Sequence, residues 1–403
     1  MFKVAKFGGT SVADKIGFQR VAEWVRSDED IKTIVLSAGG KTAQSKKVTD
    51  LLVDASNAIF KGEGIVKSLN PFVERVLGDA GAIGLENSIK DELMKIEQEI
   101  EKNLSLDFIL SRGEYFYSKL FSAYYGLPFV DSASLIGFYK DGSLNMGLSQ
   151  FQINRAYEKY GKFVCGGFYG ALPNGEIKTF TRGGGDFSGA IVAKSLCARQ
   201  YVNFTDVDGI FPFAPSEKVS EPIKEISFDK MRLLGEFGAS VLHPASVLPL
   251  YGTETEILVK NTFNKSAEGT KVKENSFETP FAVAIKEKCV YCKMVKRGKG
   301  YNLANLIDGN YAKVICQVSS LDFLQVCFSG SWKEEFKHKG LDFCQVQEDV
   351  TVFYLTPCET SSNLVAKVQK IAGVLLVGVF DCGVYIATIG EGVKSVKKLI
   401  YEG

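Results

Sequence analysis

The segment Lys6-Phe7-Gly8-Gly9-Thr10-Ser11, close to the N-terminus, constrains the fold more than any other feature of this chain. It completes an apolar segment, residues 2–7, whose pattern predicts a β-strand. The two glycines allow the backbone to approach a bulky anion without interference from a Cβ atom. We expect Thr10 and Ser11 to cap a following helix, whose free amides favour phosphate, while Lys6 supplies a mobile charge. This order of elements predicts an α/β fold with a phosphoryl-transfer site after its first strand.

Strands and helices alternate along residues 1 to about 265. Short apolar segments that end in glycine or polar residues predict strands, and segments with helical spacing and charged outer faces predict helices. The predicted strands include 31–38, 163–168 and 201–205, and the predicted helices include 47–60, 91–103 and 188–198. This alternation predicts a three-layer sandwich with a largely parallel sheet, which binds ligands at the carboxyl ends of its strands. The residues that fall at such ends are Gly8, Gly39, Gly166 and Asp206.

The pattern changes after residues 268–280, a segment rich in Lys, Glu, Ser and Thr. Several β-rich segments follow, together with helical segments at 362–371 and 393–401. They predict two small α+β modules. We place the boundary near residue 275, which gives a first domain of residues 1–275 and a second region of residues 276–403.

Charge and hydropathy exclude several classes of partner. Lys plus Arg number 48 and Asp plus Glu 47, a net charge of +1 that gives no electrostatic case for nucleic acid or an anionic membrane. No uncharged apolar segment is long enough to span a bilayer. Because the chain enters a strand at once, without a basic and apolar leader, we expect a cytoplasmic protein.

The nine cysteines predict free thiols and no metal site. Cys289 and Cys292 form the only C-x-x-C motif. They lie in a segment with a strand pattern, in which residues three apart face opposite sides of a sheet. Shared ligation of a metal by this pair is therefore geometrically poor.

A second glycine-rich cluster spans Thr181 to Ser188 and includes Gly183-Gly184-Gly185. Arg182 could hold a carboxylate in a bidentate fork, and Asp186 could orient a lysine or a metal-bound nucleotide. Taken alone, the cluster could also be a flexible turn with a solvated arginine. A second glycine turn between a strand and a helix in the same domain favours a binding function.

A third polar cluster, Thr205-Asp206-Val207-Asp208-Gly209, follows another predicted strand and suits a nucleotide, although an ordinary Asp-Gly turn has the same sequence. The chain has only two histidines, His243 and His338, which gives little support to a hydrolase with a histidine base. A carboxylate acceptor needs no base, because its pKa of about 4 leaves it ionised at neutral pH. Phosphoryl transfer to a carboxylate therefore fits the residues present.

These motifs, in this order, resemble those of aspartate kinases, which belong to the amino acid kinase superfamily. The resemblance covers residues 2 to about 263 and includes the segment Phe237-Gly238-Ala239-Ser240-Val241-Leu242-His243-Pro244. It implies transfer of the ATP γ-phosphate to the β-carboxylate of L-aspartate, with Mg²⁺, on the route to lysine, threonine and methionine. It further implies C-terminal ACT modules that bind an amino acid effector, and a homodimer or higher homo-oligomer.

The resemblance also assigns site residues. Lys6 and Asp186 are the implied catalytic residues, and the implied substrate-binding residues are Thr49, Glu114, Arg182 and Gly185. The implied ATP-binding residues are Lys6, Gly8, Gly9, Ser11, Thr205, Asp206, Phe211, Lys260 and Asn261.

The chain departs from the family pattern at two places. Gly185 replaces a serine that is usual in the family, and residues 212–216 lack the usual arginine on the nucleotide side. These departures leave two alternatives open: a kinase for another small carboxylate, and a non-catalytic amino acid sensor.

Overall fold

The structure is a computed structural model that describes residues 2–180, 183–214, 217–237, 242–276, 281–295, 312–320, 322–331, 333, 343–356, 361–380 and 383–402. The chain divides into two compact units, which we call unit 1 (residues 1–210 and 241–275) and unit 2 (residues 211–240 and 276–403). One boundary between the units therefore follows residue 275, as predicted for the domains, but residues 211–240 belong to unit 2 together with the C-terminal part of the chain. The division into two functional domains at residue 275 therefore stays a prediction.

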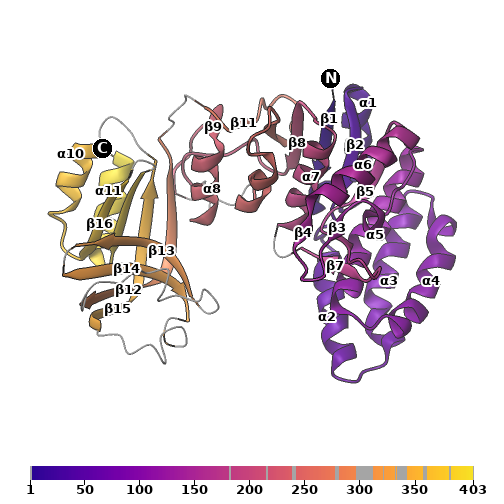
Figure 1. Cartoon of the computed structure of the whole chain (residues 1–403), viewed down its shortest axis with the longest axis horizontal. Coiled ribbons are helices and arrows are strands. Elements are labelled where there is room, and N and C mark those ends of the chain that lie inside the picture. The colour runs from indigo at the N-terminus through magenta and orange to yellow at the C-terminus, as the bar shows by residue number, and fades with distance from the viewer. Residues whose placement is uncertain are drawn as a thin grey trace. The chain divides into compact units, whose positions relative to one another are not determined.

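Unit 1 is built around a largely parallel sheet with the strand order β5-β2-β1-β8-β10-β11 (Figure 1). The strands are β1 (Lys3–Phe7), β2 (Ile31–Leu36), β5 (Phe163–Gly166), β8 (Gln200–Thr205), β10 (Glu256–Asn261) and β11 (Thr270–Lys273). Neighbouring strands are parallel from β5 to β10, and β11 is antiparallel to β10. The predicted α/β fold is confirmed, and the carboxyl ends of β1, β2, β5 and β8 lie along one edge.

Helices cover both faces of this sheet. In α1 (Lys15–Ser27) the buried residues Phe18, Val21, Ala22 and Val25 follow helical spacing, so the helix has one apolar face. This face packs with residues of β1, β2 and β8 in a core that also contains α2 (Val48–Phe60), α3 (Ile65–Ala82), α4 (Glu86–Lys102) and α5 (Leu106–Tyr125). On the other face lies α7 (Gly184–Ser195), which contacts α6 (Met146–Tyr160).

Short elements complete unit 1. A small sheet has the order β4-β3-β6-β7, with β3 (Gly137–Phe138), β4 (Leu144–Asn145), β6 (Tyr169–Ala171) and β7 (Ile177–Thr179). Three 3-10 turns are η1 (Gly9–Val12), η2 (Ser132–Ser134) and η3 (Pro244–Leu250).

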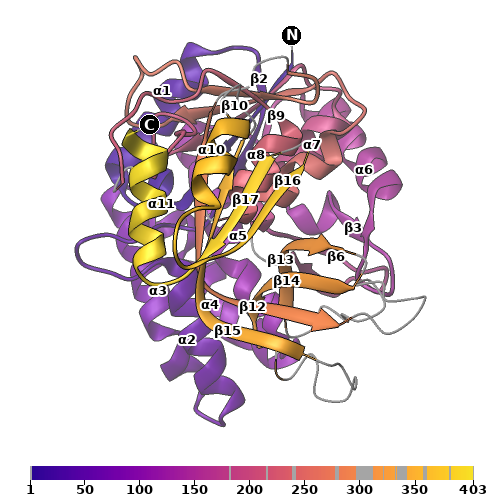
Figure 2. The same ribbon diagram turned by 90° about the vertical axis from the view of Figure 1, so that its left-hand side faces the viewer.

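Unit 2 contains an antiparallel sheet with the order β13-β14-β12-β15-β17-β16 (Figure 2). Its strands are β12 (Val283–Val295), β13 (Ala312–Ser319), β14 (Phe323–Gly330), β15 (Phe343–Leu355), β16 (Val374–Phe380) and β17 (Gly383–Thr388). The other elements are β9 (Glu225–Ser227), α8 (Phe228–Glu236), α10 (Ser361–Val368) and α11 (Glu391–Glu402). The predicted α+β character is confirmed. The long strands β12 and β15 contribute to two separate apolar clusters, one of which includes α10 and α11, so both modules share one sheet.

The structure corrects the predicted start of two helices. Thr10 and Ser11 do not cap α1, because the glycine turn continues into η1 and the side chain of Asp14 accepts the capping hydrogen bond from Gly17. The predicted helix at residues 188–198 begins earlier, at Gly184, so two of the three glycines lie inside it. Within the described residues, none of the helices has the length and apolar character needed to cross a membrane.

Candidate active site

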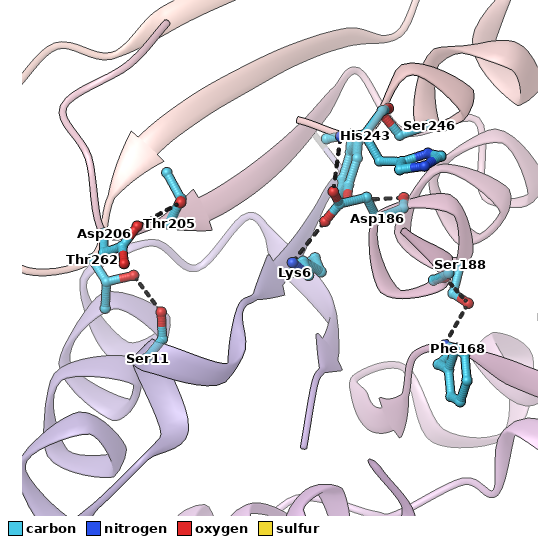
Figure 3. Close-up of polar contacts among 12 residues, drawn as sticks. Lys6, Ser11, Phe168, Asp186, Ser188, Thr205, Asp206, His243, Ser246 and Thr262 are labelled. Atoms are coloured by element: carbon cyan, nitrogen blue, oxygen red, sulfur yellow. Dashed lines mark hydrogen bonds and ion pairs between the residues drawn. The ribbon is translucent and has the colours of Figure 1, made fainter. Parts of the chain in front are cut away.

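An ion pair at the carboxyl edge of the parallel sheet forms the centre of the candidate site. Lys6 lies near the end of β1, and Asp186 lies in the first turn of α7. Their Nζ and Oδ1 atoms are 2.7 Å apart, and the two side chains are only 10% and 15% exposed. The second carboxylate oxygen of Asp186 accepts a hydrogen bond of 3.2 Å from the backbone N–H of His243 (Figure 3). The fold thus joins three segments that are far apart in the sequence.

The surroundings keep Asp186 ionised. Burial by itself would raise the pKa of this carboxyl, but the charge of Lys6 and the hydrogen bonds from Lys6 and His243 outweigh burial and lower the pKa. Asp186 is therefore an anion at neutral pH and can hold the Lys6 ammonium in a fixed position. A fixed cation beside a glycine turn is what a transferring phosphoryl group requires.

The glycines of the second cluster allow the backbone at the start of α7 to lie close to His243 and Lys6. Gly183 has φ = 78°, and a Cβ atom there would lie 2.0 Å from Cγ of the His243 ring, so no other residue fits. Gly185 is next to Lys6: a Cβ at position 185 would lie 3.5 Å from Cε of Lys6 and 3.2 Å from Oγ of Ser37. A side chain at position 185 would therefore crowd Ser37 and lie in contact with Lys6.

Glu114 is the second charged group of the site. It lies on α5, is 5% exposed, and has no hydrogen-bond partner for Oε2 among the described residues. Burial raises its pKa to about 7, although a backbone hydrogen bond from Ala38 and the charge of Lys6 both oppose this rise. A buried carboxylate oxygen without a donor is costly. The site would gain from a ligand that carries a positive charge.

Two polar residues at this edge were missed in the sequence. Ser37 directly follows β2, and its backbone N–H donates to Phe7 at 3.1 Å. Asn203 is the register partner of Lys6 on β8, and its buried side-chain amide helps to lower the pKa of Asp186. A polar residue after an apolar strand could have revealed Ser37, whereas Asn203 lies inside an apolar strand and gives no such signal.

The predicted acceptor residues Thr49 and Arg182 and the predicted nucleotide residue Phe211 have different outcomes. Thr49 is the second residue of α2, and the preceding Val48 donates to the carbonyl of Gly39 at 2.9 Å, which holds the start of α2 close to the end of β2. Arg182 lies outside the described residues. Phe211 belongs to unit 2.

The predicted nucleotide residues form a second group of contacts (Figure 3). Ser11 and Thr262 share a buried hydrogen bond of 2.7 Å between their hydroxyls. Thr205 donates to the carboxylate of Asp206 at 3.3 Å directly after β8. The structure thus joins the first glycine turn to the end of β10, and Thr262 is a residue that the sequence did not reveal.

Asn261 and Lys260 have different positions although they are adjacent. The amide of Asn261 donates to Asp208 at 2.7 Å, which connects the ends of β10 and β8. Lys260 is in register with Phe204, and therefore lies on the sheet face opposite to Lys6. Its ammonium donates to the carbonyl of Ala267 at 2.6 Å. The structure does not bring Lys260 to the ion pair.

The described residues contain no group of three or more His, Cys, Asp or Glu side chains that could hold a metal ion. Cys289 and Cys292 are buried in unit 2, and burial raises the pKa of each thiol to about 12. Both remain neutral thiols at physiological pH.

Comparison with known proteins identifies the family of unit 1. Residues 1–261 match the model of the amino acid kinase family. The chain belongs to this family. Among curated proteins it is similar to aspartokinase 3 of Bacillus subtilis (33% identity, 67% of this chain and 63% of that protein) and to the aspartokinase of Chlamydia pneumoniae (29% identity, 67% and 62%). The chain thus spans less than two thirds of the length of these relatives.

Solved structures share the fold over the full chain. The aspartate kinase of Clostridium acetobutylicum superimposes with a TM-score of 0.87 at 24% identity, covering 100% of this chain and 99% of that chain. Aspartokinase III of Escherichia coli, in complex with aspartate and ADP, superimposes with a TM-score of 0.80 at 20% identity, with the same coverage. This likeness establishes the fold of both units, including the α+β region at the C-terminus.

Proposed function

We propose that this protein is an aspartate kinase, which transfers the γ-phosphate of ATP to the β-carboxylate of L-aspartate and forms 4-phospho-L-aspartate. The buried Lys6–Asp186 pair beside the first glycine turn is the observation that carries this proposal. The names of the curated relatives and the aspartate–ADP complex of the Escherichia coli protein support it. The product would enter the biosynthesis of lysine, threonine and methionine.

Lys6 and the glycine turn would act on the transferring phosphoryl group. A Cβ at Gly8 would lie 3.7 Å from Nζ of Lys6, so the ammonium is next to the backbone of the turn. The ammonium would neutralise charge that develops on the phosphoryl oxygens, and amides near Gly8 and Gly9 would donate to them. Asp186 would keep Lys6 in place, because its pKa is lowered and it remains charged.

The acceptor would bind on the side of α5. Glu114 would take the α-ammonium of aspartate, since its Oε2 atom is buried and lacks a donor. Arg182 would bind the α-carboxylate, and Thr49 would contact the substrate from the start of α2. Ser37 would supply a hydroxyl close to Gly185.

The nucleotide would bind along the ends of β8 and β10. The groups available there come from Ser11, Thr205, Asp206 and Asn261, which the hydrogen bonds described above connect. The proposal includes Phe211 and Lys260, because the resemblance to aspartate kinases assigns both residues to ATP binding. Mg²⁺ fits as part of the substrate MgATP, because Mg²⁺ commonly uses one or two carboxylates together with phosphate oxygens and several waters. Asp186 and Asp206 are two carboxylates at this edge that could take part.

We further propose that the C-terminal modules bind an amino acid effector, and that the protein is a cytoplasmic homodimer or higher homo-oligomer. The Escherichia coli relative has been crystallised with lysine and aspartate. Light scattering at micromolar concentration tests the oligomer, and a monomer would contradict it.

The reaction can be tested by trapping the acyl phosphate as a hydroxamate, with MgATP and L-aspartate. We expect a signal in the wild type and at least about a hundredfold less in Lys6→Ala, the size of effect that loss of one transition-state contact produces. Lys3→Ala is a matched control, because Lys3 lies on the same strand and pairs with Asp28, away from the site. Intact nucleotide binding without any hydroxamate from aspartate would contradict the proposal.

A second candidate is a kinase for another small carboxylate, which Gly185 favours because a serine is usual at this position in the family. The same assay with glutamate and acetylglutamate separates the two. A larger kcat/KM with either of them than with aspartate would select this second candidate.

A further inference from the structure

Arg75 is a buried cation that lies outside the proposed substrate contacts. It belongs to α3 and is 8% exposed. Its Nε atom donates to Oδ2 of Asp79 at 2.8 Å, one turn further along the same helix. The other hydrogen bonds of its guanidinium go to backbone carbonyls, which is unusual for so buried a charge.

These carbonyls come from two segments of unit 1. Nη2 donates to Ala13, just after η1, at 2.8 Å and to Gly40, near the start of the loop between β2 and α2, at 3.1 Å. Nη1 donates to Lys46, at the end of the same loop, at 3.0 Å. A planar guanidinium with a fixed fork of donors can hold both ends of this loop and the turn after η1 at once, which a lysine ammonium on a flexible stem does less well.

Both segments are connected to residues of the candidate site. The amide of Gly40 donates to the carbonyl of Gly9 at 2.8 Å, and a Cβ at Gly40 would lie 2.7 Å from the same oxygen. The first glycine turn and the loop after β2 are therefore in direct backbone contact. The segment at Lys46 leads into α2, which carries Thr49. Arg75 thus connects the phosphate side of the site to the acceptor side.

The guanidinium is itself held in place from α5. The hydroxyl of Tyr117 donates to Oδ2 of Asp79, the oxygen that also accepts from Arg75. Tyr117 is fully buried, and its ring is against Gly39, where a Cβ would lie 2.3 Å from Cζ. Figure 1 shows α2, α3 and α5 packed side by side in unit 1. The chain Tyr117–Asp79–Arg75 therefore joins these helices to the loops of the site.

We infer that Arg75 is a positioning residue for phosphoryl transfer, which sets the distance between the glycine turn that holds the phosphate and the loop and helix that hold the acceptor. It touches no reacting atom and acts through the carbonyls of Ala13, Gly40 and Lys46. This inference rests on the proposed kinase function. Misplacement of reacting groups by about 1 Å can lower turnover by roughly a hundredfold.

The test compares Arg75→Lys with Arg112→Lys in the full-length protein. Arg112 is a matched control: it is 5% exposed, it stacks on Phe108 at 4.3 Å, and its described hydrogen bonds go to the side chain of Ser111. We expect Arg75→Lys to lower kcat by about tenfold to a hundredfold, with KM for ATP changed by less than about threefold. Arg112→Lys should keep kcat within about threefold of the wild type at a similar loss of thermal stability.

A second measurement, amide hydrogen exchange, does not depend on the reaction. Amide hydrogen exchange should become at least about tenfold faster at Gly40 and Val48 in Arg75→Lys, and should not change there in Arg112→Lys. A milder variant, Asp79→Asn, keeps the guanidinium and should show a smaller change of the same kind.

The outcomes separate the two proposals. If the wild type shows no turnover of aspartate, the proposed function fails, while the exchange data still test whether Arg75 holds the loops. If Arg75→Lys keeps the kcat of the wild type, or loses activity only in proportion to its unfolded fraction, the positioning role is wrong. Unchanged exchange at Gly40 and Val48 would overturn it as well.

Discussion

The large sheets of unit 1 and unit 2 are surrounded by different kinds of buried side chain. Next to the parallel sheet of unit 1, four charged side chains are buried: Lys6, Arg75, Arg112 and Glu114. In the described part of unit 2, the buried polar side chains include three threonines, and none of the buried side chains is Lys, Arg, Asp or Glu. Burying a charge costs free energy unless it is paired or hydrogen-bonded. The comparison therefore shows that unit 1 is less stable than it could be because it buries charges for its site. The described sheet of unit 2 has no such buried charges, and its side chains serve packing.

Removal of the charge on Asp186 should have the largest effect on the reaction. Asp186→Asn leaves Lys6 without its anion, so we expect kcat to fall by at least about a hundredfold. Asp107→Asn is the control, since it removes the charge from a half-buried ion pair of unit 1 with Lys178. Steady-state kinetics of both variants measure this difference. A loss of less than about threefold in Asp186→Asn would show that the buried pair is not part of the site.

Glu114→Gln should raise KM for aspartate by about thirtyfold or more, because the ammonium of the substrate would lose its charged partner in a buried site. The pKa of Glu114 is about 7, so the carboxyl must lose its proton before it can bind the ammonium. In the wild type, kcat/KM for aspartate should therefore rise with pH through about 7. The variant should lack this rise. A pH profile shared by both proteins would contradict the assignment.

Glu114 should also couple stability to pH. Its pKa is raised from 4.5 in the unfolded chain to about 7 in the folded protein, so the folded state holds more protons between these values. The stabilising effect of the proton is complete below pH 4.5 and is lost as the pH rises towards 7. Glu114→Gln should therefore gain roughly 1–3 kcal/mol relative to the wild type between pH 4.5 and 8. Denaturant unfolding at both pH values measures this gain.

A core substitution in unit 2 should change stability without changing the chemistry. Val326 is fully buried in the apolar cluster of β12 and β14. Val326→Ala should lower the free energy of unfolding by roughly 1–3 kcal/mol, because it removes buried methyl groups and leaves a cavity. We expect kcat for aspartate to stay within about twofold, as measured at a temperature at which the variant is folded. A large loss of kcat would show that packing in unit 2 controls the site in unit 1.

Lys260→Met should have the smallest effect. Lys260 lies on the opposite sheet face from Lys6 and donates to the carbonyl of Ala267, so we expect KM for ATP to change by less than about threefold. Titration of the nucleotide measures the same affinity directly. An increase of tenfold or more would support the role in nucleotide binding that the resemblance implies for Lys260.

Much of the fold could be predicted from the sequence, because its signals are local. The apolar segments before Gly8, Gly39 and Asp206 are strands, and their shared carboxyl edge follows from parallel pairing. The capping of α1 could not be predicted, since Asp14 and Ser11 are both good capping residues and only the 3-10 turn decides between them. The strands β12 and β15 extend beyond their most apolar residues, so a pattern of short apolar segments does not reveal their full length.

The sequence by itself determined the glycine turns, the charged residues beside them and the resemblance to aspartate kinases, because these depend on residue type and spacing along the chain. Only the tertiary structure decided which of these groups meet. It joined Lys6 to Asp186, placed Ser37 beside Gly185, and turned Lys260 to the other face of the sheet. It also brought three loop carbonyls to Arg75, a residue without any sequence signal. Contacts between distant segments depend on strand order, register and helix packing, and a single sequence does not encode these in any local pattern.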